Sequence, residues 1–384
     1  MLISPVNAEP AEIETARRLG DAFALGAAED DLAGRFPTGH VAALRDAGLL
    51  ALTAPEQFGG QGAGLGLAAS IIREIGRGDP AVALILVMQY AHLATLHRGR
   101  WSEALVTRVV RAAAKEGALI NALRVEPALG TPMRGGLPET VARQAGDGWL
   151  LTGRKIYSTG SEGLRWGVVW ARTDEDEPRV GQFLVPLDAE GVRIIPGWDT
   201  LGLRASSSHD VEFQDVYLPA DHAADIRRPS EWAIRADEAI AWSSLLISAL
   251  YTGVAEAGRD WIVAFLKSRV PANLGKPLAE LPRMQEAVGG IEERIAVNRR
   301  LIASAAAETD AGQAPAAREV GIIKHVATEN AIAAVEAALK LAGNHGISRK
   351  NPLERHYRDV LCGRIHTPQE DSVLLAAGRT ALGT

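Results

Sequence analysis

Two histidines are the residues best suited to proton chemistry in this chain. His366 stands in the segment GRIHTPQED, close to the carboxylates of Glu370 and Asp371, and His92 follows Tyr90 in a long apolar run. An imidazole has a reference pKa of about 6.5, so it can hold or release a proton near neutral pH. The structural alternatives are a loop histidine that only caps or hydrogen-bonds, for His366, and a buried, hydrogen-bonded core histidine, for His92.

Other kinds of chemistry find little support in the residues. The nine histidines include no HExxH motif, and Cys362 is the only cysteine, which rules out a disulfide within the chain. We expect no metal site, because a cysteine-based zinc site needs more thiolates. Gly64, Gly66 and Ala69 match GxGxxA, but no strand is expected before them, so we interpret this segment as a turn-rich loop.

Charge and hydropathy narrow the choice of partners. The net charge is -6, with acidic and basic residues mixed along the chain, so we expect no nucleic-acid partner. The first residues are polar and acidic, unlike a signal peptide. No apolar run approaches the roughly 20 residues that a membrane helix needs. We expect no membrane association and a cytoplasmic location.

The pattern of apolar residues predicts an α+β protein in three parts. Residues 1–120 favour helices, including one that begins at Asp79-Pro80, an N-cap followed by proline at the first helical position. Residues 121–230 show short apolar runs with period-two alternation, typical of a β domain. Residues 231–384 contain long helices with short loops, typical of an antiparallel bundle.

Four segments, in order and at family-like spacing, resemble the acyl-CoA dehydrogenase superfamily. They span nearly the whole chain and comprise residues 36–64 with 73–83, 125–131 with 153–160, 201–219, and 341–360. The resemblance implies an N-terminal all-α domain, a middle β-barrel or sandwich domain and a C-terminal four-helix bundle, with a flavin between them. It also implies a homo-oligomer, either a dimer or, as we expect, a tetramer.

The same resemblance assigns roles in the middle domain. Thr131, in VEPALGT, matches a serine that contacts the flavin phosphate in the family. Within GRKIYSTG, Tyr157 matches an aromatic residue that shields the flavin, and Thr159 matches a threonine near its N5 and O4 edge. Ser206 and Ser207, in RASSSHD, belong to a segment that lines the active site in the family. From the residues alone, these serines are expected to close a β-turn through their hydroxyls.

Further cofactor contacts are implied in the bundle. Gly343 and Gly346 match a glycine turn that lies near the flavin of a neighbouring subunit, although GNHG departs from the usual GGxG. The segment SRVPANLGKPLAELP, with Arg269, resembles an RxPxxxG segment of flavin-dependent monooxygenases on this fold. True dehydrogenases have RKxFG there, part of which grips the FAD adenine, so the resemblance favours FMN over FAD.

The chain departs from the dehydrogenases at the catalytic base. A dehydrogenase of this family removes an α-proton of an acyl thioester with a carboxylate, and the two positions for that base are Thr367 and Ser243 in this sequence. A family arginine that helps to bind acyl-CoA falls on Ser244. Side chains that do not titrate near pH 7 cannot serve as this base.

The segment HYRDVLCGRIHTP is instead similar to that of the group D monooxygenases on this fold, which include dibenzothiophene monooxygenases and enzymes that oxygenate amino sugars. In that group a histidine at the place of His366 sits beside the flavin, and polar residues on the helix of Tyr90 and His92 line the pocket. The leading hypothesis is a two-component monooxygenase that receives reduced flavin from a separate reductase. The alternatives are an acyl-CoA or acyl-carrier dehydrogenase with a relocated base, such as Glu370, and a flavin-binding protein without catalysis.

Overall fold

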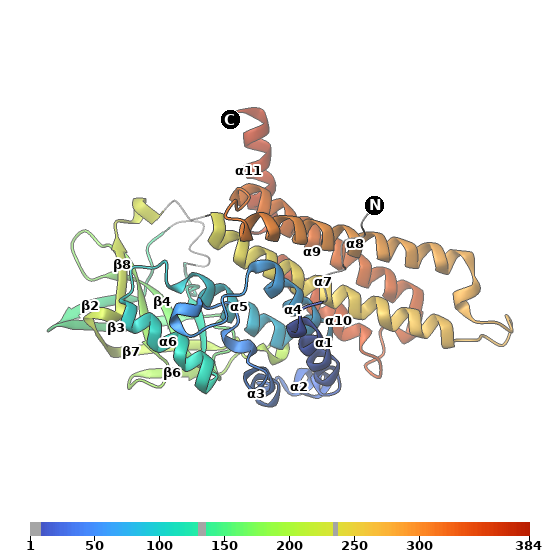
Figure 1. The fold of residues 1–384 in the computed structure, drawn as a ribbon, viewed down its shortest axis with the longest axis horizontal. Helices are drawn as coiled ribbons and strands as arrows, with labels where there is room; N and C mark the ends of the chain where they lie inside the picture. The colour runs from blue at the N-terminus through green and yellow to red at the C-terminus, as the bar shows by residue number, and fades with distance from the viewer. Residues whose placement is uncertain (1–8, 130–135, 233–236) are drawn as a thin grey trace, which may run out of the picture.

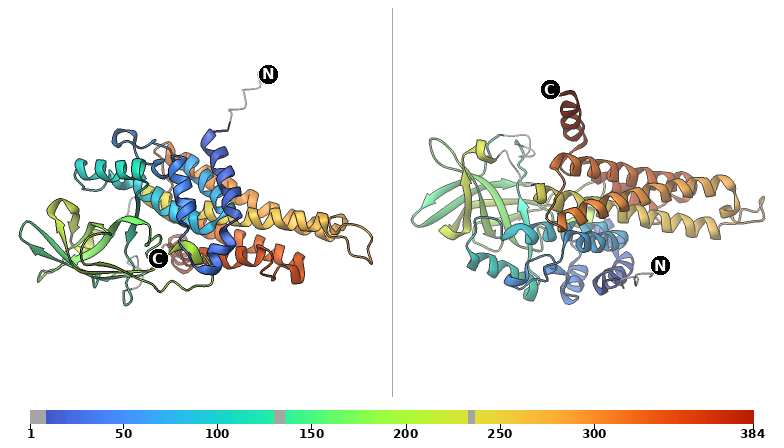
Figure 2. Two further views of the ribbon diagram at one scale, coloured as in Figure 1. Left: turned by 90° about the horizontal axis from the view of Figure 1, so that it is seen from below. Right: turned by 45° about the horizontal axis from the view of Figure 1, so that its top comes forward.

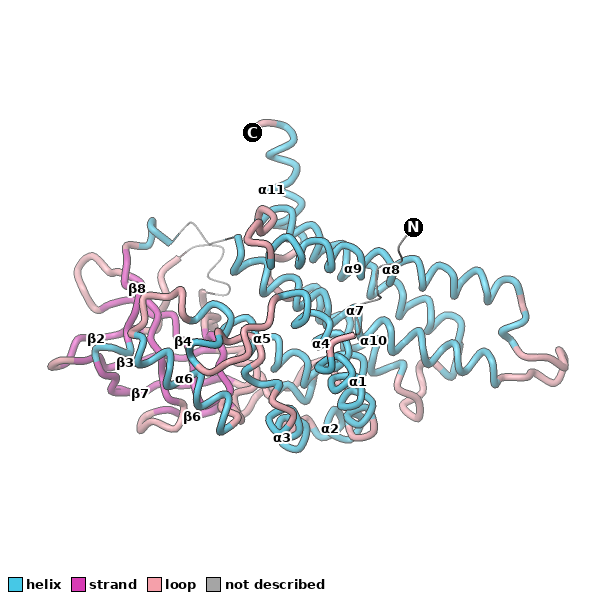
Figure 3. The backbone as a smooth tube through the Cα atoms, viewed as in Figure 1, coloured by secondary structure: helices cyan, strands magenta, loops and turns pink. Residues whose placement is uncertain are grey.

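The computed structural model describes residues 9–129, 136–232 and 237–384, and it has the three expected parts (Figure 1). A helical N-terminal part lies beside a β-sheet on one side and a bundle of long helices on the other. The tube view shows that the strands are confined to one end of the molecule and that helices make up the rest (Figure 3). The order helical, β, helical confirms the predicted fold class.

The N-terminal part is built around one helix that is apolar on every side. That helix, α5, begins as predicted, because the Asp79 carboxylate accepts hydrogen bonds from the amides of Ala81 and Val82. Nearly all of its residues are buried, as expected for a helix without a polar face. From residue 9 on, where the described residues begin, the α-helices of this part are α1 (Ala11–Ala24), α2 (Ala27–Ala33), α3 (Thr38–Asp46), α4 (Leu65–Gly78), α5 (Pro80–Leu96) and α6 (Glu103–Glu116).

The glycine-rich segment is a loop only as far as Gly64, which is the N-cap of α4; Gly66 and Ala69, predicted to belong to the loop, lie inside this helix. The amides of Leu65 and Gly66 at the start of α4 donate to the carboxylate of Asp310, at 2.6 and 2.9 Å. A protein carboxylate therefore occupies the helix N-terminus at which a dinucleotide phosphate would bind. This contact also ties the N-terminal part to the bundle, because Asp310 is the last residue of α8.

The middle part is one mixed, mainly antiparallel sheet. Its strands are β1 (Leu119–Leu123), β2 (Val141–Ala145), β3 (Gly148–Lys155), β4 (Leu164–Thr173), β5 (Val180–Pro186), β6 (Val192–Ile195), β7 (Asp210–Pro219) and β8 (Ala223–Arg227). They are ordered β6-β7-β3-β2-β4-β5-β8, and β1 joins the sheet as a parallel neighbour of β4. Valine, tryptophan and phenylalanine on β4 and β5 fill its core.

Over residues 237–384, all of which the structure describes, the bundle has three long helices and two shorter ones. They are α7 (Asp237–Ser268), α8 (Pro282–Asp310), α9 (Ala317–Ala342), α10 (Leu353–Leu361) and α11 (Glu370–Leu382). The sequence did not predict α11, which stands away from the body of the molecule (Figure 2). Its single buried residue is Val373, which packs beside Gly321 of α9.

One helix differs from the hydropathy expectation. Among the described residues, α7 is long and apolar enough to pass a test for a membrane span, although no apolar run of that length was expected. Within this window 78% of the residues are buried in the protein. The apolar character of α7 therefore follows from its central place in the bundle, where it packs against α4, α5, α8 and α9.

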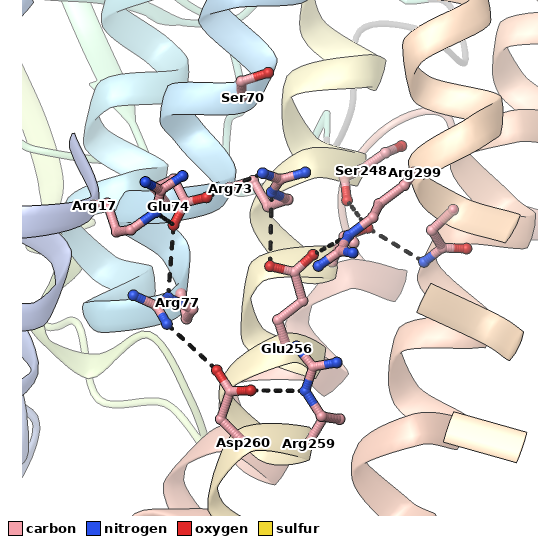
Figure 4. Close-up of polar contacts among 12 residues, drawn as sticks. Arg17, Ser70, Arg73, Glu74, Arg77, Ser248, Glu256, Arg259, Asp260 and Arg299 are labelled. Carbon is pink, nitrogen blue, oxygen red and sulfur yellow. Dashed lines mark hydrogen bonds and ion pairs between the residues drawn. The ribbon is translucent and has the colours of Figure 1, made fainter. Parts of the chain in front are cut away.

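Ion pairs fasten the N-terminal part to the bundle (Figure 4). Glu256 on α7 is 3% exposed and accepts from Arg299 of α8 at 2.7 Å, with Arg73 of α4 at 3.6 Å. Glu74 on α4 is also buried and lies between Arg17 of α1 and the arginines of its own helix. The buried carboxylates thus have several cationic partners, as buried charges require.

Candidate functional site

The turn after β3 presents an aromatic ring at the surface of the β domain. Tyr157 has a backbone φ of 57°, a conformation that residues other than glycine rarely adopt, and its side chain is 60% exposed. Its ring meets that of Trp198 edge to face, with centroids 6.2 Å apart. Strained backbone of this kind persists only where its surroundings hold it in place.

Those surroundings include residues 197–209, called here the seryl loop. The amides of Gly160 and Ser161 donate to the carbonyls of Ser206 and Ser207, both at 2.9 Å. The Thr159 hydroxyl lies 2.9 Å from that of Ser208. The serines therefore hold the 157–161 turn to the seryl loop. Among the described contacts, the hydroxyls of Ser206 and Ser207 bond other hydroxyls and the Glu162 amide, and they do not close the β-turn that the sequence predicts.

A second support comes from β1 and α5. The Asn121 side chain donates to the Thr159 carbonyl at 3.0 Å, and the next residue, Ala122, donates its amide to Nε2 of His92 at 3.0 Å. Nε2 of His92 must carry a lone pair to accept this bond, so it cannot exchange a proton while the bond lasts. Tyr90 is fully buried, and its hydroxyl has no hydrogen-bond partner among the described residues.

His366 lies against two buried residues of the bundle that the sequence analysis did not single out. Its Nε2 is 2.8 Å from the hydroxyl of Tyr251 on α7. Its backbone carbonyl accepts from Nζ of Lys324 on α9 at 2.7 Å, and the same ammonium donates to the Gly363 carbonyl at 2.9 Å. His366 lies between η9 (Cys362–Arg364) and α11 and is partly buried.

These neighbours keep the imidazole neutral. Burial, assisted by the positive charge of Lys324, lowers the pKa of His366 to about 3. Burial raises the pKa of the Tyr251 phenol well above 10, and it lowers the pKa of Lys324 to about 8. At pH 7 a neutral imidazole and a neutral phenol therefore share a hydrogen bond beside a lysine that is mainly protonated.

The remaining predicted cofactor residues lie at the other end of the bundle. Arg269 is exposed just after α7, and Gly343 is exposed just after α9, while Gly346 is buried against Leu339. Arg269 is 18 residues beyond Tyr251, or about 27 Å at 1.5 Å per helical residue. One chain therefore does not bring these residues together with His366.

Thr131 lies outside the described residues, but Glu126, which precedes it in the chain, is firmly held. Glu126 and Lys155 are both fully buried, and Nζ of Lys155 donates to Glu126 at 2.6 Å. Glu126 also accepts from the Thr140 hydroxyl and from the amides of Glu139 and Thr140. Burial lowers the pKa of Lys155 to about 8, a shift that Glu126 opposes.

The residues of the 157–161 turn fit a planar, polar ring system such as a flavin. An exposed aromatic ring, Tyr157, stands beside the hydroxyls of Thr159 and Ser208. The buried hydroxyl of Ser158 has no partner among the described residues. A face for stacking next to hydroxyl groups is what a flavin edge needs.

Comparison with known protein families finds three matching models. They are the acyl-CoA dehydrogenase N-terminal domain over residues 11–100, the middle domain over 124–216 and the C-terminal domain over 245–370. The YdbM protein of Bacillus subtilis, assigned to the acyl-CoA dehydrogenases, is 33% identical over 371 residues, which are 94% of each chain.

Solved structures of an FMN-binding protein and of an acyl-CoA dehydrogenase both have this fold. KijD3, in complex with FMN and a dTDP-linked amino sugar, has a TM-score of 0.85 and 28% identity over 99% of this chain and 95% of its own. Butyryl-CoA dehydrogenase from Megasphaera elsdenii has a TM-score of 0.89 and 23% identity over the full length of both chains. The fold alone therefore does not separate the two kinds of protein.

Proposed function

The chain belongs to the acyl-CoA dehydrogenase family, and from this premise we propose that it is a two-component monooxygenase that uses reduced flavin and molecular oxygen. The family consists of flavin-dependent oxidoreductases. The proposed substrate is a small organic molecule, and the proposed flavin is FMN, supported by the likeness to KijD3 with FMN bound. A separate reductase would supply the reduced flavin.

The main support for this proposal is the side-chain chemistry at the two positions where a dehydrogenase of this family has its catalytic base. Thr367 has no titratable group near pH 7, and the Ser243 hydroxyl is hydrogen-bonded to the carbonyls of Ala239 and Ile240 within its own helix. Glu370, the relocated candidate, is exposed in the first turn of α11. None of the three offers a carboxylate held in a buried pocket.

His366 supplies a different kind of proton chemistry. The proton of its neutral imidazole is on Nδ1 when Tyr251 donates to Nε2, and on Nε2 when Tyr251 accepts. Nδ1 makes no hydrogen bond to another described residue, so it can donate a hydrogen bond to a substrate or cofactor in the first tautomer and accept one in the second. A bound flavin would supply the electrons that activate oxygen, and Tyr157 and Thr159 would hold it.

The competing function is an acyl-CoA dehydrogenase, which the likeness to YdbM over 94% of both chains favours. Two measurements separate the functions. Reduced FMN, supplied by an added reductase, should lead to transfer of isotopically labelled oxygen to a substrate in a panel that includes dTDP-linked amino sugars and dibenzothiophene. A panel of acyl-CoAs, mixed anaerobically with the flavin-loaded protein, should leave the visible flavin absorbance unchanged.

Rapid bleaching by any acyl-CoA would refute the monooxygenase proposal, and loss of bleaching in Glu370→Gln would then identify the base. A protein that binds flavin cleanly but is silent in both assays would instead be a binding protein without catalysis.

A further inference from the structure

A carboxylate of the bundle hydrogen-bonds to the seryl loop. Asp359, on α10, is 3% exposed, and its Oδ1 accepts from the backbone amide of Leu203 at 2.7 Å. Leu203 has a φ of 53°, so its backbone conformation is one that an L-residue keeps only under constraint. Asp359 supplies a specific, buried constraint at this residue.

The backbone around this bond is packed too closely to move independently. A side chain at Gly202 would lie 2.4 Å from the carbonyl of Arg358, so α10 and the loop are in direct backbone contact there. Arg358 donates to the Leu201 carbonyl at 2.9 Å. Two consecutive residues of α10 therefore hydrogen-bond to the loop residues on either side of Gly202.

From Leu203 the contacts continue to the 157–161 turn. The Leu203 carbonyl accepts from Nε1 of Trp198 at 3.0 Å, and the Trp198 ring packs edge to face on Tyr157. The seryl loop thus joins Asp359 on one side to the exposed aromatic ring on the other. The same chain segment runs from Asp359 through η9 to His366.

We propose that Asp359 is a positioning residue, which fixes the seryl loop against α10 and thereby sets Tyr157 and Thr159 for flavin binding. This inference rests on the proposed flavin site, although not on the identity of the reaction. Asp359 does not touch the site directly: it acts through the Leu203 amide and the Trp198 ring.

The test uses Asp359→Ala, which removes the acceptor, and Asp359→Asn, which keeps a carbonyl oxygen for the Leu203 amide. Glu354→Gln is a control for a change of charge on the same helix, because glutamine keeps an oxygen acceptor for Arg358, so the bond from Arg358 to the Leu201 carbonyl should remain. Hydrogen–deuterium exchange of residues 197–209 in the flavin-free protein measures how firmly Asp359 holds the seryl loop. The dissociation constant of FMN measures how the hold on the loop affects the proposed flavin site.

In Asp359→Ala, exchange in the loop should accelerate about tenfold or more, because the buried Leu203 amide is left without its acceptor, and FMN should bind at least about tenfold more weakly. Asp359→Asn and Glu354→Gln should stay near the wild type in both measurements. Unchanged exchange in Asp359→Ala, or faster exchange with unchanged FMN affinity, would overturn the inference.

If Asp359→Ala fails to fold, Trp198→Phe tests the other side of Leu203, because it keeps a ring beside Tyr157 but removes the donor to the Leu203 carbonyl. It should weaken FMN binding several-fold, and an unchanged affinity would contradict the inference. None of these measurements requires turnover, so each decides the inference whether or not the chain oxygenates a substrate.

Discussion

His366 has one ring nitrogen bonded to a buried phenol, and this contact changes what its removal should do. In His366→Ala the Tyr251 hydroxyl would lose its partner, which we expect to cost about 1–3 kcal/mol of stability. Oxygenation should fall by about 10²–10⁴-fold, the range for loss of a positioned acid or base. Hydrogen peroxide released per reduced flavin should rise. Product yield, peroxide yield and urea unfolding measure the three effects.

Two control variants separate the imidazole from the shape of its segment. Tyr251→Phe combined with His366→Ala removes both bonded groups, so stability should recover while oxygenation stays low. Cys362→Ala alters the same segment without removing the imidazole. Equal losses of activity in Cys362→Ala and His366→Ala would mean that the loop's shape matters, and full activity in His366→Ala would exclude the residue from the mechanism.

Asp359 should make stability depend on pH in an unusual direction. Burial, together with the nearby negative charge of Asp31, raises its pKa to about 7, although the bond from Leu203 opposes the shift. Between the ordinary pKa near 4 and pH 7, the folded protein therefore binds a proton that the unfolded chain has released. The contribution of Asp359 to the free energy of unfolding therefore falls as the pH rises through that window, and it is constant above it.

Replacing Asp359 with asparagine removes this titration. The melting temperature of Asp359→Asn relative to the wild type should therefore rise as pH increases from about 5 to 8. The comparison cancels the other titrating groups, provided that the variant leaves the charged side chains around Asp359 in place. Those side chains lie on α2, at the start of α5, in the seryl loop and on α10, and they are Asp31, Asp79, Arg204, Arg355 and Arg358. A difference in melting temperature that does not change with pH would contradict the assigned pKa.

Among the secondary-structure elements, α7 carries the carboxylate that holds α4 and α8 together. In Glu256→Ala, Arg73 and Arg299 would lose a shared buried partner. Removal of one partner of a fully buried pair costs about 3–5 kcal/mol; we expect about 2 kcal/mol here, because both arginines are partly exposed. Urea unfolding of the variant measures this loss.

Glu292→Gln is the appropriate comparison for Glu256→Ala. Glu292 pairs with Arg259 at the surface, where both partners reach water, so its loss should change stability by less than about 1 kcal/mol. Similar losses in both variants would indicate that burial of Glu256 adds nothing to its ion pairs.

The sequence could predict elements whose signals are local. The start of α5 at Asp79-Pro80, the alternation in β7 and the long helices α7, α8 and α9 each follow from composition and period within one segment. The helix α11 was missed, because its apolar residues are not arranged to face one core and only Val373 is buried. Whether the apolar α7 lies in a protein core or a membrane depends on partners far away in the chain.

Much less of the site could be predicted, since its contacts join distant segments. Family resemblance pointed to Tyr157, Thr159 and His366, but Tyr251 and Lys324 carried no signal except a polar side chain within an apolar stretch of helix. No motif in the sequence singles out Asp359. Its bond to Leu203 spans 156 residues of sequence and cannot be read from either segment alone.

At the scale of the whole molecule, the exposed apolar surface predicts an oligomer, which we expect to be a tetramer formed through the C-terminal bundle. Leu374, Leu375 and Leu382 on the outlying helix α11 are 49%, 55% and 79% exposed. Burial of such side chains against another copy of the chain would remove apolar surface from water, at about 25 cal/mol per Å². Light scattering at micromolar concentration measures the mass, and a monomer would contradict the prediction.

The separation of the predicted cofactor residues makes the oligomer a condition for a complete site. Tyr157 lies at the β-domain end of the chain, whereas Arg269 lies at the far end of the bundle, about 27 Å of helix beyond Tyr251. If a second copy of the chain supplies the Arg269 end of each flavin site, Tyr157→Ala and Arg269→Ala should each weaken FMN binding when expressed alone. In a mixed oligomer of the two variants, some sites would combine an unaltered Tyr157 from one chain with an unaltered Arg269 from the other. Co-expression and purification through two different tags should therefore recover a fraction of tight FMN sites that neither variant has. If the mixed oligomer forms but no tight sites return, both residues act within one chain, and the shared site is wrong.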